Sequence, residues 1–418
     1  MTRPDPTSGP DASASLVRLV RDEGRAVLAS LARSLGDLGL AEDAVQDAVV
    51  AALGSWPTSG VPPNPRAWLF TTARRRAIDR IRREDVRGPK ETEAVRLLEQ
   101  EPPMVTDSAV HDDLLRLVFT CCHPALSPET QVALSLHTLC GLTTAEVAGA
   151  LVVTEATMAK RLTRARRKIA VAAIPYRVPP DHELPDRLAQ VTTTVYLVFN
   201  EGYASALGTE HVRTDLCDEA IRLARLLTEL LPGDASLQGL LALMLLQDAR
   251  RATRVDEAGD VVLLVDQDRS LWDREAIAEG VVLVGEGLRR TPDRPDRYVV
   301  QAAIAACHDL APTYAETEWD AVISWYDVLL TINDTPVIRL NRAAAVAERD
   351  GPEPALALVD QITGLERYPL WHGSRAELLG RLGRHQEAAD ALRTALDLPV
   401  SDPLRRTLER RLAELAEA

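Results

Sequence analysis

Helical periodicity runs through almost the whole sequence. Apolar residues recur every three or four positions from Leu16 to Leu35, from Leu114 to Ala173, and in successive segments up to Ala418. This spacing places apolar side chains along one face of an α-helix. Ala and Leu dominate and aromatic residues make up only 4% of the 418 residues, which favours helices over a β-sandwich. The sequence therefore predicts an all-α fold.

One segment departs from the helical pattern. Residues 252–265 contain a β-branched run that follows a turn sequence ending in Gly259. Such a pattern is typical of a short strand after a turn. We expect one small β-hairpin near residues 252–265.

Proline-rich and polar stretches divide the chain, which is too long for one ordinary core. We expect a disordered tail at 1–13, a helical domain at 14–86, a linker at 87–109, a second helical domain at 110–175 and a helical extension at 176–418.

Charge and cysteine usage limit the partners and the compartment. The formal net charge of −14 is uneven, at +2 over residues 1–180 and −16 over residues 181–418. A polyanionic partner must therefore bind the N-terminal part. Five irregularly spaced cysteines indicate a reducing compartment, and no segment reads as a signal peptide or a membrane helix. We expect a cytoplasmic protein that does not contact the membrane.

Residues 143–170 have the features of a helix-turn-helix. Thr143 and Glu146 form a capping box for a short helix, and Thr154 caps a longer basic helix over 155–170. Two helices joined by a tight turn, the second of them basic, suit the major groove of duplex DNA. The alternative is a basic, solvated helix in an unrelated helical protein.

The second helix supplies the candidate DNA contacts. Its N-terminal part is placed to reach base edges and phosphates, and its later basic residues to neutralise the flanking backbone. The candidates are Glu155, Thr157, Lys160, Arg161, Arg164, Arg167 and Lys168.

A second basic helix is expected over residues 65–83, after a loop that contains Asn64. Trp68 falls on the apolar stripe of this helix. Taken by itself, that position indicates a side chain that packs in the core. Arginines beside a loop suit single-stranded nucleic acid, whose unstacked bases enter pockets. The arginines are Arg74, Arg75, Arg76, Arg80, Arg82 and Arg83.

An acidic, amphipathic helix precedes this segment. It carries Glu42, Asp43, Gln46 and Asp47 and is not expected to touch DNA. A surface of this kind is either inert or a docking site for a protein partner.

In this order, the motifs resemble those of bacterial sigma factors. The sequences EDAVQD, NPRAWLF followed by ARRRAIDR, and GLTTAEVA followed by TMAKRLTRAR are similar to regions two and four of the extracytoplasmic-function (ECF) group of the sigma-70 family. The resemblance covers residues 14–175. It implies two small helical sigma domains, the second of them a helix-turn-helix.

The resemblance also implies partners and site residues. The β′ clamp helices of core RNA polymerase would bind a surface of this chain formed by Glu42, Asp43, Gln46 and Asp47. The β flap of the polymerase would be a further contact. The −10 element would be bound by Asn64, Trp68, Arg74, Arg75, Arg76, Arg80 and Arg83, and the −35 element by the candidates on helix 155–170. Arg75 departs from many relatives, which carry Asn there, and this bears on the −10 preference.

The C-terminal half resembles the ECF subgroup with a tetratricopeptide-like extension. Gly383, Ala388, Leu392 and Ala395 fall at the small and apolar positions of one helix pair, and Ala343 and Ala355 indicate another. Stacked pairs form a concave surface that suits a peptide or protein ligand. The resemblance implies that this half regulates activity.

Catalytic and metal-binding signals are weak. The polar candidates in the C-terminal half have no recognised catalytic or metal-ligand spacing; they are Glu201, His211, Cys217, Asp266, Asp268, Asp273 and His308. Cys121, Cys122 and Cys140 lie near histidines, but small buried thiols are the better interpretation. We expect neither an enzyme nor a cofactor or metal site.

We therefore predict an alternative sigma factor controlled by its own C-terminal domain. The acidic half either covers the basic helices in the free protein or stabilises the open complex. Two other classes stay open: a helix-turn-helix regulator with a sensor domain that acts without polymerase, and a peptide-binding scaffold.

Overall fold

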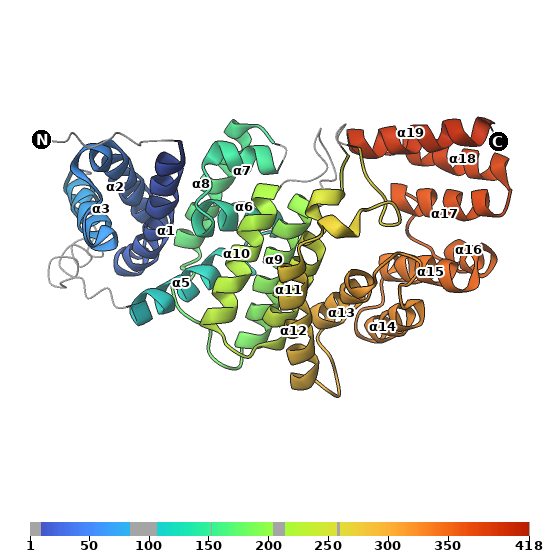
Figure 1. Cartoon of the computed structure of the whole chain (residues 1–418). Coiled ribbons are helices and arrows are strands. Elements are labelled where there is room, and N and C mark those ends of the chain that lie inside the picture. The colour runs from blue at the N-terminus through green and yellow to red at the C-terminus, as the bar shows by residue number, and fades with distance from the viewer. Residues whose placement is uncertain (1–9, 84–106, 152, 204–213, 257–259, 418) are drawn as a thin grey trace, which may run out of the picture. The chain divides into compact units, whose positions relative to one another are not determined.

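The helical segments expected from the sequence form α-helices throughout the part of the chain that a computed structural model describes, residues 10–83, 107–151, 153–203, 214–256 and 260–417 (Figure 1). Those residues contain no strand, so the all-α prediction is confirmed. None of their helices is long and apolar enough to cross a membrane. Most of the predicted linker and residues 1–9 of the predicted tail lie outside the described residues, and residues 10–13 of that tail are helical.

Contacts along the chain divide it into an N-terminal unit up to Thr194 and a C-terminal unit from Val195. Three helices of the N-terminal unit pack against one another and are called the first bundle: α1 (Pro10–Leu35), α2 (Leu38–Ser59) and α3 (Pro65–Arg83). Four alanines on α2, Ala41, Ala44, Ala48 and Ala52, are fully or almost fully buried, which lets its neighbours approach closely. The acidic helix predicted around Glu42 and Asp47 continues to Ser59, where Gly60 ends it with a φ of 82°.

The following helices are called the second bundle: α5 (Asp107–Cys121), α6 (Pro128–Leu134), the π-helical turn η1 (Ser135–Leu139), α7 (Thr144–Ala150) and α8 (Glu155–Val171). The sequence predicts an ordinary helix up to Gly141. Its last turn instead widens into a π-helix, and Gly141 then adopts a φ of 71°. Such turns occur where a helix must re-aim a side chain.

Helix α9 (Leu184–Tyr203) carries the boundary between the two units. The next helices of the C-terminal unit are α10 (Thr214–Leu230), α11 (Ala235–Asp248), α12 (Arg274–Arg290) and α13 (Arg297–Leu310), with short 3₁₀ turns η2 (Arg251–Thr253) and η3 (Arg269–Leu271). Helix α11 forms the centre of this group and crosses α13 closely. A Cβ at Gly239 would lie 2.5 Å from the backbone nitrogen of Val299, so this crossing requires glycine.

The last helices stack in antiparallel pairs: α14 (Trp319–Ile332), α15 (Pro336–Asp350), α16 (Pro352–Asp360), α17 (Pro369–Arg381), α18 (His385–Leu396) and α19 (Asp402–Glu417). Ala343 and Ala355 are buried in the α15–α16 pair. In the α17–α18 pair Gly383 makes the turn with a φ of 73°, and Ala388 and Leu392 are buried. The predicted C-terminal helical domain is confirmed, and the residues expected in two helix pairs lie in such pairs.

The predicted hairpin near 252–265 is reduced to a single antiparallel bridge between Val255 and Val261. Residues 257–259 lie outside the described residues. Two backbone hydrogen bonds accompany the bridge, from the N–H of Val262 to the carbonyl oxygen of Arg254 at 2.9 Å and from the N–H of Asp256 to that of Asp260 at 3.0 Å. Asp260 also forms ion pairs of 2.5 and 3.2 Å with Arg406 and Arg410 of α19.

Candidate nucleic-acid interface

The two predicted caps set the geometry of the helix-turn-helix. The backbone N–H of Thr143 donates to Glu146 Oε2 at 2.6 Å, and the N–H of Glu146 donates to Thr143 Oγ1 at 3.2 Å. Thr154 Oγ1 accepts from the N–H of Thr157 at 3.3 Å. Both predicted caps are therefore confirmed, and they fix where α7 and α8 begin.

Helix α8 has one apolar face and one polar face. Met158, Leu162, Ala165 and Ile169 are buried. Six of the seven predicted DNA-contact residues lie on the side of α8 opposite that core: Thr157, Lys160, Arg164, Arg167 and Lys168 are exposed and Arg161 is half-buried. Glu155, also exposed, lies on another side of the first turn, where it lines a groove with Val45, Val49 and Leu142.

A groove of about 390 Å³ follows this polar side. Ser127 and Thr130 of the α6 region line one wall, and Lys160, Arg161, Arg164 and Lys168 line the other. Hydroxyls opposite a row of cations form a surface that suits phosphate oxygens.

Helix α3 presents the second set of candidates. Asn64 Oδ1 accepts from the backbone N–H of Ala67 at 2.9 Å and so caps the helix. Trp68 is half-buried and packs edge-to-face on Trp56, with ring centroids 5.3 Å apart. This packing gives Trp68 a role in the core of the first bundle. The contact between Trp68 and DNA stays a prediction.

The α3 arginines differ in exposure. Arg75 and Arg76 are exposed, Arg74 is half-buried, and Arg80 forms an ion pair of 3.0 Å with Asp43 of α2. Arg83 ends the helix. The exposed side of α3 is strongly basic.

The four acidic and polar candidates on α2 do not share one environment. Asp43, Gln46 and Asp47 are exposed, whereas Glu42 is only 5% exposed. Its carboxylate contacts the second bundle through Thr138 and Arg166. Periodicity could not identify these partners, because they lie about a hundred residues further along the chain.

The cysteines beside the second bundle are buried thiols, as expected. Cys122 lies 3.6 Å from Ser135 Oγ, and burial raises the pKa of its thiol to about 11. Among the described residues, no group of three or more His, Cys, Asp or Glu side chains has the arrangement of a metal site. His137 instead contacts the carbonyl oxygen of Leu142 through Nδ1 at 2.8 Å.

Helix α9 packs on the second bundle through Gln131, which is 1% exposed. Gln131 Nε2 donates to the carbonyl oxygens of His123 and Leu126 at 3.0 and 3.1 Å. Its Oε1 accepts from Gln190 at 2.8 Å and Thr194 at 3.1 Å. The start of the extension is therefore part of the second bundle's structure.

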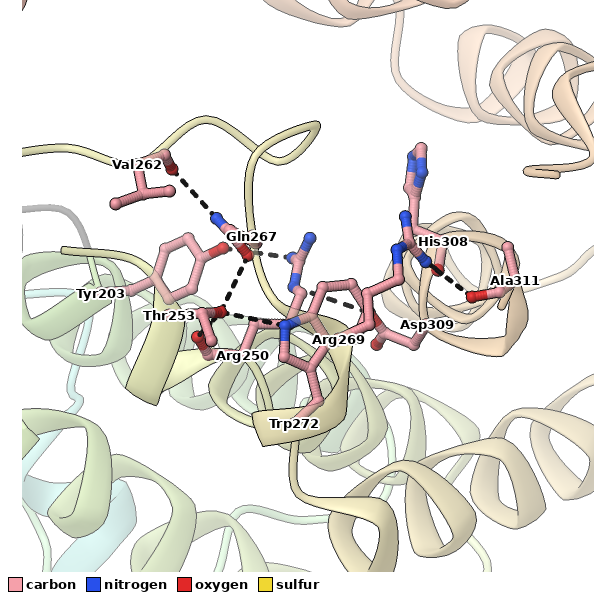
Figure 2. A network of polar contacts seen from close by, with 10 residues as sticks. All are labelled: Tyr203, Arg250, Thr253, Val262, Gln267, Arg269, Trp272, His308, Asp309 and Ala311. Atoms are coloured by element: carbon pink, nitrogen blue, oxygen red, sulfur yellow. Dashed lines mark hydrogen bonds and ion pairs between the residues drawn. The ribbon is translucent and has the colours of Figure 1, made fainter. Parts of the chain in front are cut away.

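The C-terminal unit contains a buried polar network that the sequence did not reveal as a whole (Figure 2). Thr253 Oγ1 accepts from Trp272 Nε1 at 2.9 Å. Arg269 is 7% exposed, lies 4.6 Å from the centre of the Trp272 ring, and donates to the carbonyl oxygens of His308 and Ala311. The network joins η2, η3 and the end of α13.

Asp309 is the most isolated member of this network. It is fully buried, and its Oδ1 lies 3.6 Å from Arg250 Nε (Figure 2). Burial raises the pKa of Asp309 to about 6, and burial also lowers the pKa of His308 to about 4. The fold therefore favours the neutral form of both side chains.

Most of the other polar candidates have ordinary structural roles. Asp268 accepts from the N–H of Ser270 at 2.9 Å, and Asp273 caps α12. Burial raises the pKa of the Cys217 thiol to about 12. His211 lies outside the described residues.

Three family profiles match the chain. "Sigma-70 region 2" matches residues 19–87 and "Sigma-70, region 4" matches residues 116–169. A family of unknown function, DUF6596, matches residues 187–287, which contain most of the network in Figure 2.

Relatives agree with these matches. The ECF RNA polymerase sigma factor SigL of Mycobacterium tuberculosis is 34% identical over 162 residues, which are 38% of this chain and 89% of SigL. The chain belongs to the ECF sigma factors. SigK of Mycobacterium ulcerans is 31% identical over 142 residues, 33% of this chain and 74% of SigK. An uncharacterized protein of Rhizobium meliloti is 43% identical over 377 residues, 89% of each chain, so its similarity includes the extension.

The first bundle thus corresponds to region 2 and the second bundle to region 4. As a sigma factor the chain has a role in transcription initiation. The extension that follows region 4 distinguishes it from SigL and SigK, whose similarity is confined to about a third of this chain.

Proposed function

We propose that this sigma factor binds core RNA polymerase through α2, opens the −10 element through α3 and reads the −35 element through α8, with its activity controlled by the C-terminal unit. The observation that carries the proposal is the capped α8, with six polar side chains, Thr157, Lys160, Arg161, Arg164, Arg167 and Lys168, on one accessible side.

Recognition of the −35 element follows from the position of α8 after the turn. Side chains of its first two turns, Thr157, Lys160 and Arg161 among them, would enter the major groove and meet base edges. Arg164, Arg167 and Lys168 lie further along and would neutralise phosphates on both sides. A groove with hydroxyls on its opposite wall supports the same orientation.

Opening of the −10 element is assigned to α3 and Asn64. Exposed Arg75 and Arg76 would hold the backbone of the displaced strand, while the capped start of α3 presents Asn64 to an unstacked base. Trp68 would hold the N-terminal end of α3 in place by packing against Trp56.

Core polymerase is assigned to the exposed acidic side of α2. Asp43, Gln46 and Asp47 would contact the β′ clamp helices, and the second bundle would contact the β flap. Complementary charge at such a surface speeds association and fixes orientation.

Control by the C-terminal unit is supported by the charge of the extension. Residues 181–418 carry a net charge of −16, opposite in sign to the basic helices α3 and α8. The stacked helix pairs are the candidate surface for a regulatory peptide or protein.

The proposal is tested by run-off transcription with purified core polymerase and a promoter library on linear duplex DNA. We expect sequence-specific transcripts that require both proteins. A Lys160→Ala, Arg161→Ala double variant should lose them, whereas Arg222→Ala, which removes a cation of the C-terminal unit, should keep them. Tight duplex binding without transcripts would favour the helix-turn-helix regulator.

A fragment of residues 1–203, which keeps α9, tests the control. More transcript from the fragment than from the whole chain would identify an inhibitor, and less would identify an activator. Equal transcription would contradict control by the C-terminal unit.

A further inference from the structure

Asp260 of the C-terminal unit is bound by two arginines of the last helix. Arg406 Nε donates to Asp260 Oδ1 at 2.5 Å, and Arg410 Nη1 donates to Asp260 Oδ2 at 3.2 Å. Arg406 and Arg410 are four positions apart on α19, so they lie on the same side of that helix. The two arginines, called the arginine pair, thus form a site that holds one carboxylate.

The residues that follow Asp260 pack loosely. Residues 260–266, called the strap, form a bridge from Val261 to Val255 and then a turn, in which the N–H of Asp266 donates to the carbonyl oxygen of Leu263 at 2.9 Å. The side chain of Leu263 is 36% exposed. Segments with few buried apolar contacts open locally at low free energy, so the strap is able to leave α19 without unfolding the unit.

The arginine pair stays open to solvent while Asp260 occupies it. The side chains of Arg406 and Arg410 are 45% and 49% exposed, whereas that of Asp260 is 13% exposed. Ion pairs of exposed arginines contribute little to stability, because water and salt screen them. A carboxylate from another molecule can therefore exchange with Asp260.

The groove beside the arginine pair limits what can follow that carboxylate. It has a volume of about 400 Å³, and Val261 and Val262 of the strap line it opposite Thr407 of α19. Glu414 lines it one turn beyond Arg410, and Asp256 and Asp266 line it as well. A second acidic residue close to the first would meet these carboxylates, so the site fits an acidic residue followed by aliphatic ones.

The charge of the occupant follows from the same contacts. The hydrogen bond from Arg406 lowers the pKa of Asp260, so its side chain is an anion at neutral pH. Guanidinium groups bind carboxylates through charge-assisted hydrogen bonds of this kind. The arginine pair therefore selects an acidic ligand although residues 181–418 carry a net charge of −16.

The strap also connects to the buried network. Gln267 Nε2 donates to the carbonyl oxygen of Val262 at 3.1 Å, and Thr253 Oγ1 donates to Gln267 Oε1 at 3.3 Å (Figure 2). Thr253 in turn accepts from Trp272. Displacement of the strap would remove the bond from Gln267 to Val262, so a ligand on α19 would alter the network.

We propose that the arginine pair is the site at which the C-terminal unit binds an acidic, extended segment of a partner protein, and that Asp260 fills this site until the partner displaces the strap. The inference rests on the proposed function, in which a regulatory peptide or protein binds this unit, and it names the site and the chemistry of the ligand.

The test is fluorescence anisotropy with the full chain and a labelled, acetylated peptide of sequence DVVLLVD, which repeats residues 260–266. A tethered competitor has an effective concentration on the order of millimolar, so the wild-type chain should bind the peptide weakly. Asp260→Asn removes the tethered carboxylate and should tighten binding by about tenfold or more.

Asp256→Ala provides a second way to loosen the strap. It removes the hydrogen bond of 2.8 Å from the Asp260 N–H to Asp256 Oδ1 and keeps both arginines. This variant should tighten binding by a smaller factor, and it serves if Asp260→Asn does not fold. Equal affinities of the wild type and both variants would overturn the proposal.

Further variants, made together with Asp260→Asn, identify the site. Arg406→Ala combined with Arg410→Ala should abolish binding. Arg393→Ala is the matched control and should leave the affinity unchanged, because it removes an exposed cation of α18 that pairs with Asp390 at 2.6 Å. A peptide with Asn in place of its first Asp should not bind. Binding that survives the loss of both arginines would contradict the proposal.

Two other measurements separate the alternatives. A wild-type dimer in sedimentation that the double arginine variant dissociates would assign the site to the strap of a second copy and contradict a separate partner. Peptide binding needs neither polymerase nor promoter DNA, whereas transcription from the 1–203 fragment decides whether the C-terminal unit controls activity. The binding site and the proposed control can therefore fail independently.

Discussion

Asp309 Oδ1 lies 3.6 Å from Arg250 Nε, and neither carboxylate oxygen accepts a hydrogen bond from the described residues. Both side chains belong to the buried network of the C-terminal unit (Figure 2). A buried charge without hydrogen bonds is costly, and the raised pKa of Asp309 reflects this cost.

Asp309 should make the protein less stable as the pH rises from about 4 to 6. Its pKa of about 6 in the fold exceeds the value of about 4 in an unfolded chain, so the native state holds the proton more tightly. Relative to Asp309→Asn, the wild-type free energy of unfolding should fall by about 2 kcal/mol over this range. Chemical denaturation at several pH values measures the difference, and parallel pH profiles would refute it.

His308 should have the opposite effect. Its pKa of about 4 lies below the usual value, so the unfolded chain binds the proton more tightly between pH 4 and 6.5. The wild-type free energy of unfolding should therefore rise over this range relative to His308→Gln. A profile for His308→Gln that rises as steeply as the wild type would show that the imidazole is not the cause.

Gln131→Ala should destabilise the N-terminal unit by about 2 kcal/mol, because it removes the hydrogen bonds by which the buried Gln131 joins α9 to the loop before α6. Thermal unfolding followed by circular dichroism measures the loss. Gln386→Ala, at an exposed position of α18, is the control and should change the midpoint little. Equal midpoints for both variants would mean that α9 does not depend on Gln131.

Thr154→Ala should cost about 1 kcal/mol, since it removes the side-chain cap of α8. Because the cap orders the turn that carries Thr157, binding to a −35 duplex should also weaken several-fold. Thr154→Ser keeps the hydroxyl and should restore both properties. Failure of serine to restore them would assign the effect to the lost methyl group.

Lys168→Ala should weaken duplex binding at every sequence to a similar degree. A lost phosphate contact should also reduce the slope of log affinity against log salt by about 0.9. Fluorescence anisotropy over a salt series measures both, with Arg222→Ala as the control. An unchanged slope would place Lys168 away from the phosphates.

Features that depend on nearby residues were predictable from the sequence. The capping box at Thr143, the cap at Thr154 and the turn at Gly383 each involve residues a few positions apart, so the local sequence determines them. The basic side of α8 followed from helical spacing for the same reason.

Features that depend on distant residues were not predictable. Glu42 reads as a surface residue because its partner Arg166 belongs to another helix far along the chain. The burial of Asp309 was not predictable, because a single aspartate at a helix end is usually solvated. The predicted hairpin is reduced to one bridge with two backbone hydrogen bonds, and the ion pairs that join the same segment to α19 involve residues too distant in the sequence to be predicted.

Gln131 takes two of its four hydrogen-bond partners from a helix that follows the sigma regions in the sequence. When the ribosome has synthesised all residues that match region 4, up to residue 169, Gln190 and Thr194 have not yet been synthesised. The second bundle can complete its hydrogen bonds only after residues 190–194 have been synthesised. The first residues of the extension must therefore be translated before the hydrogen bonds of region 4 are complete.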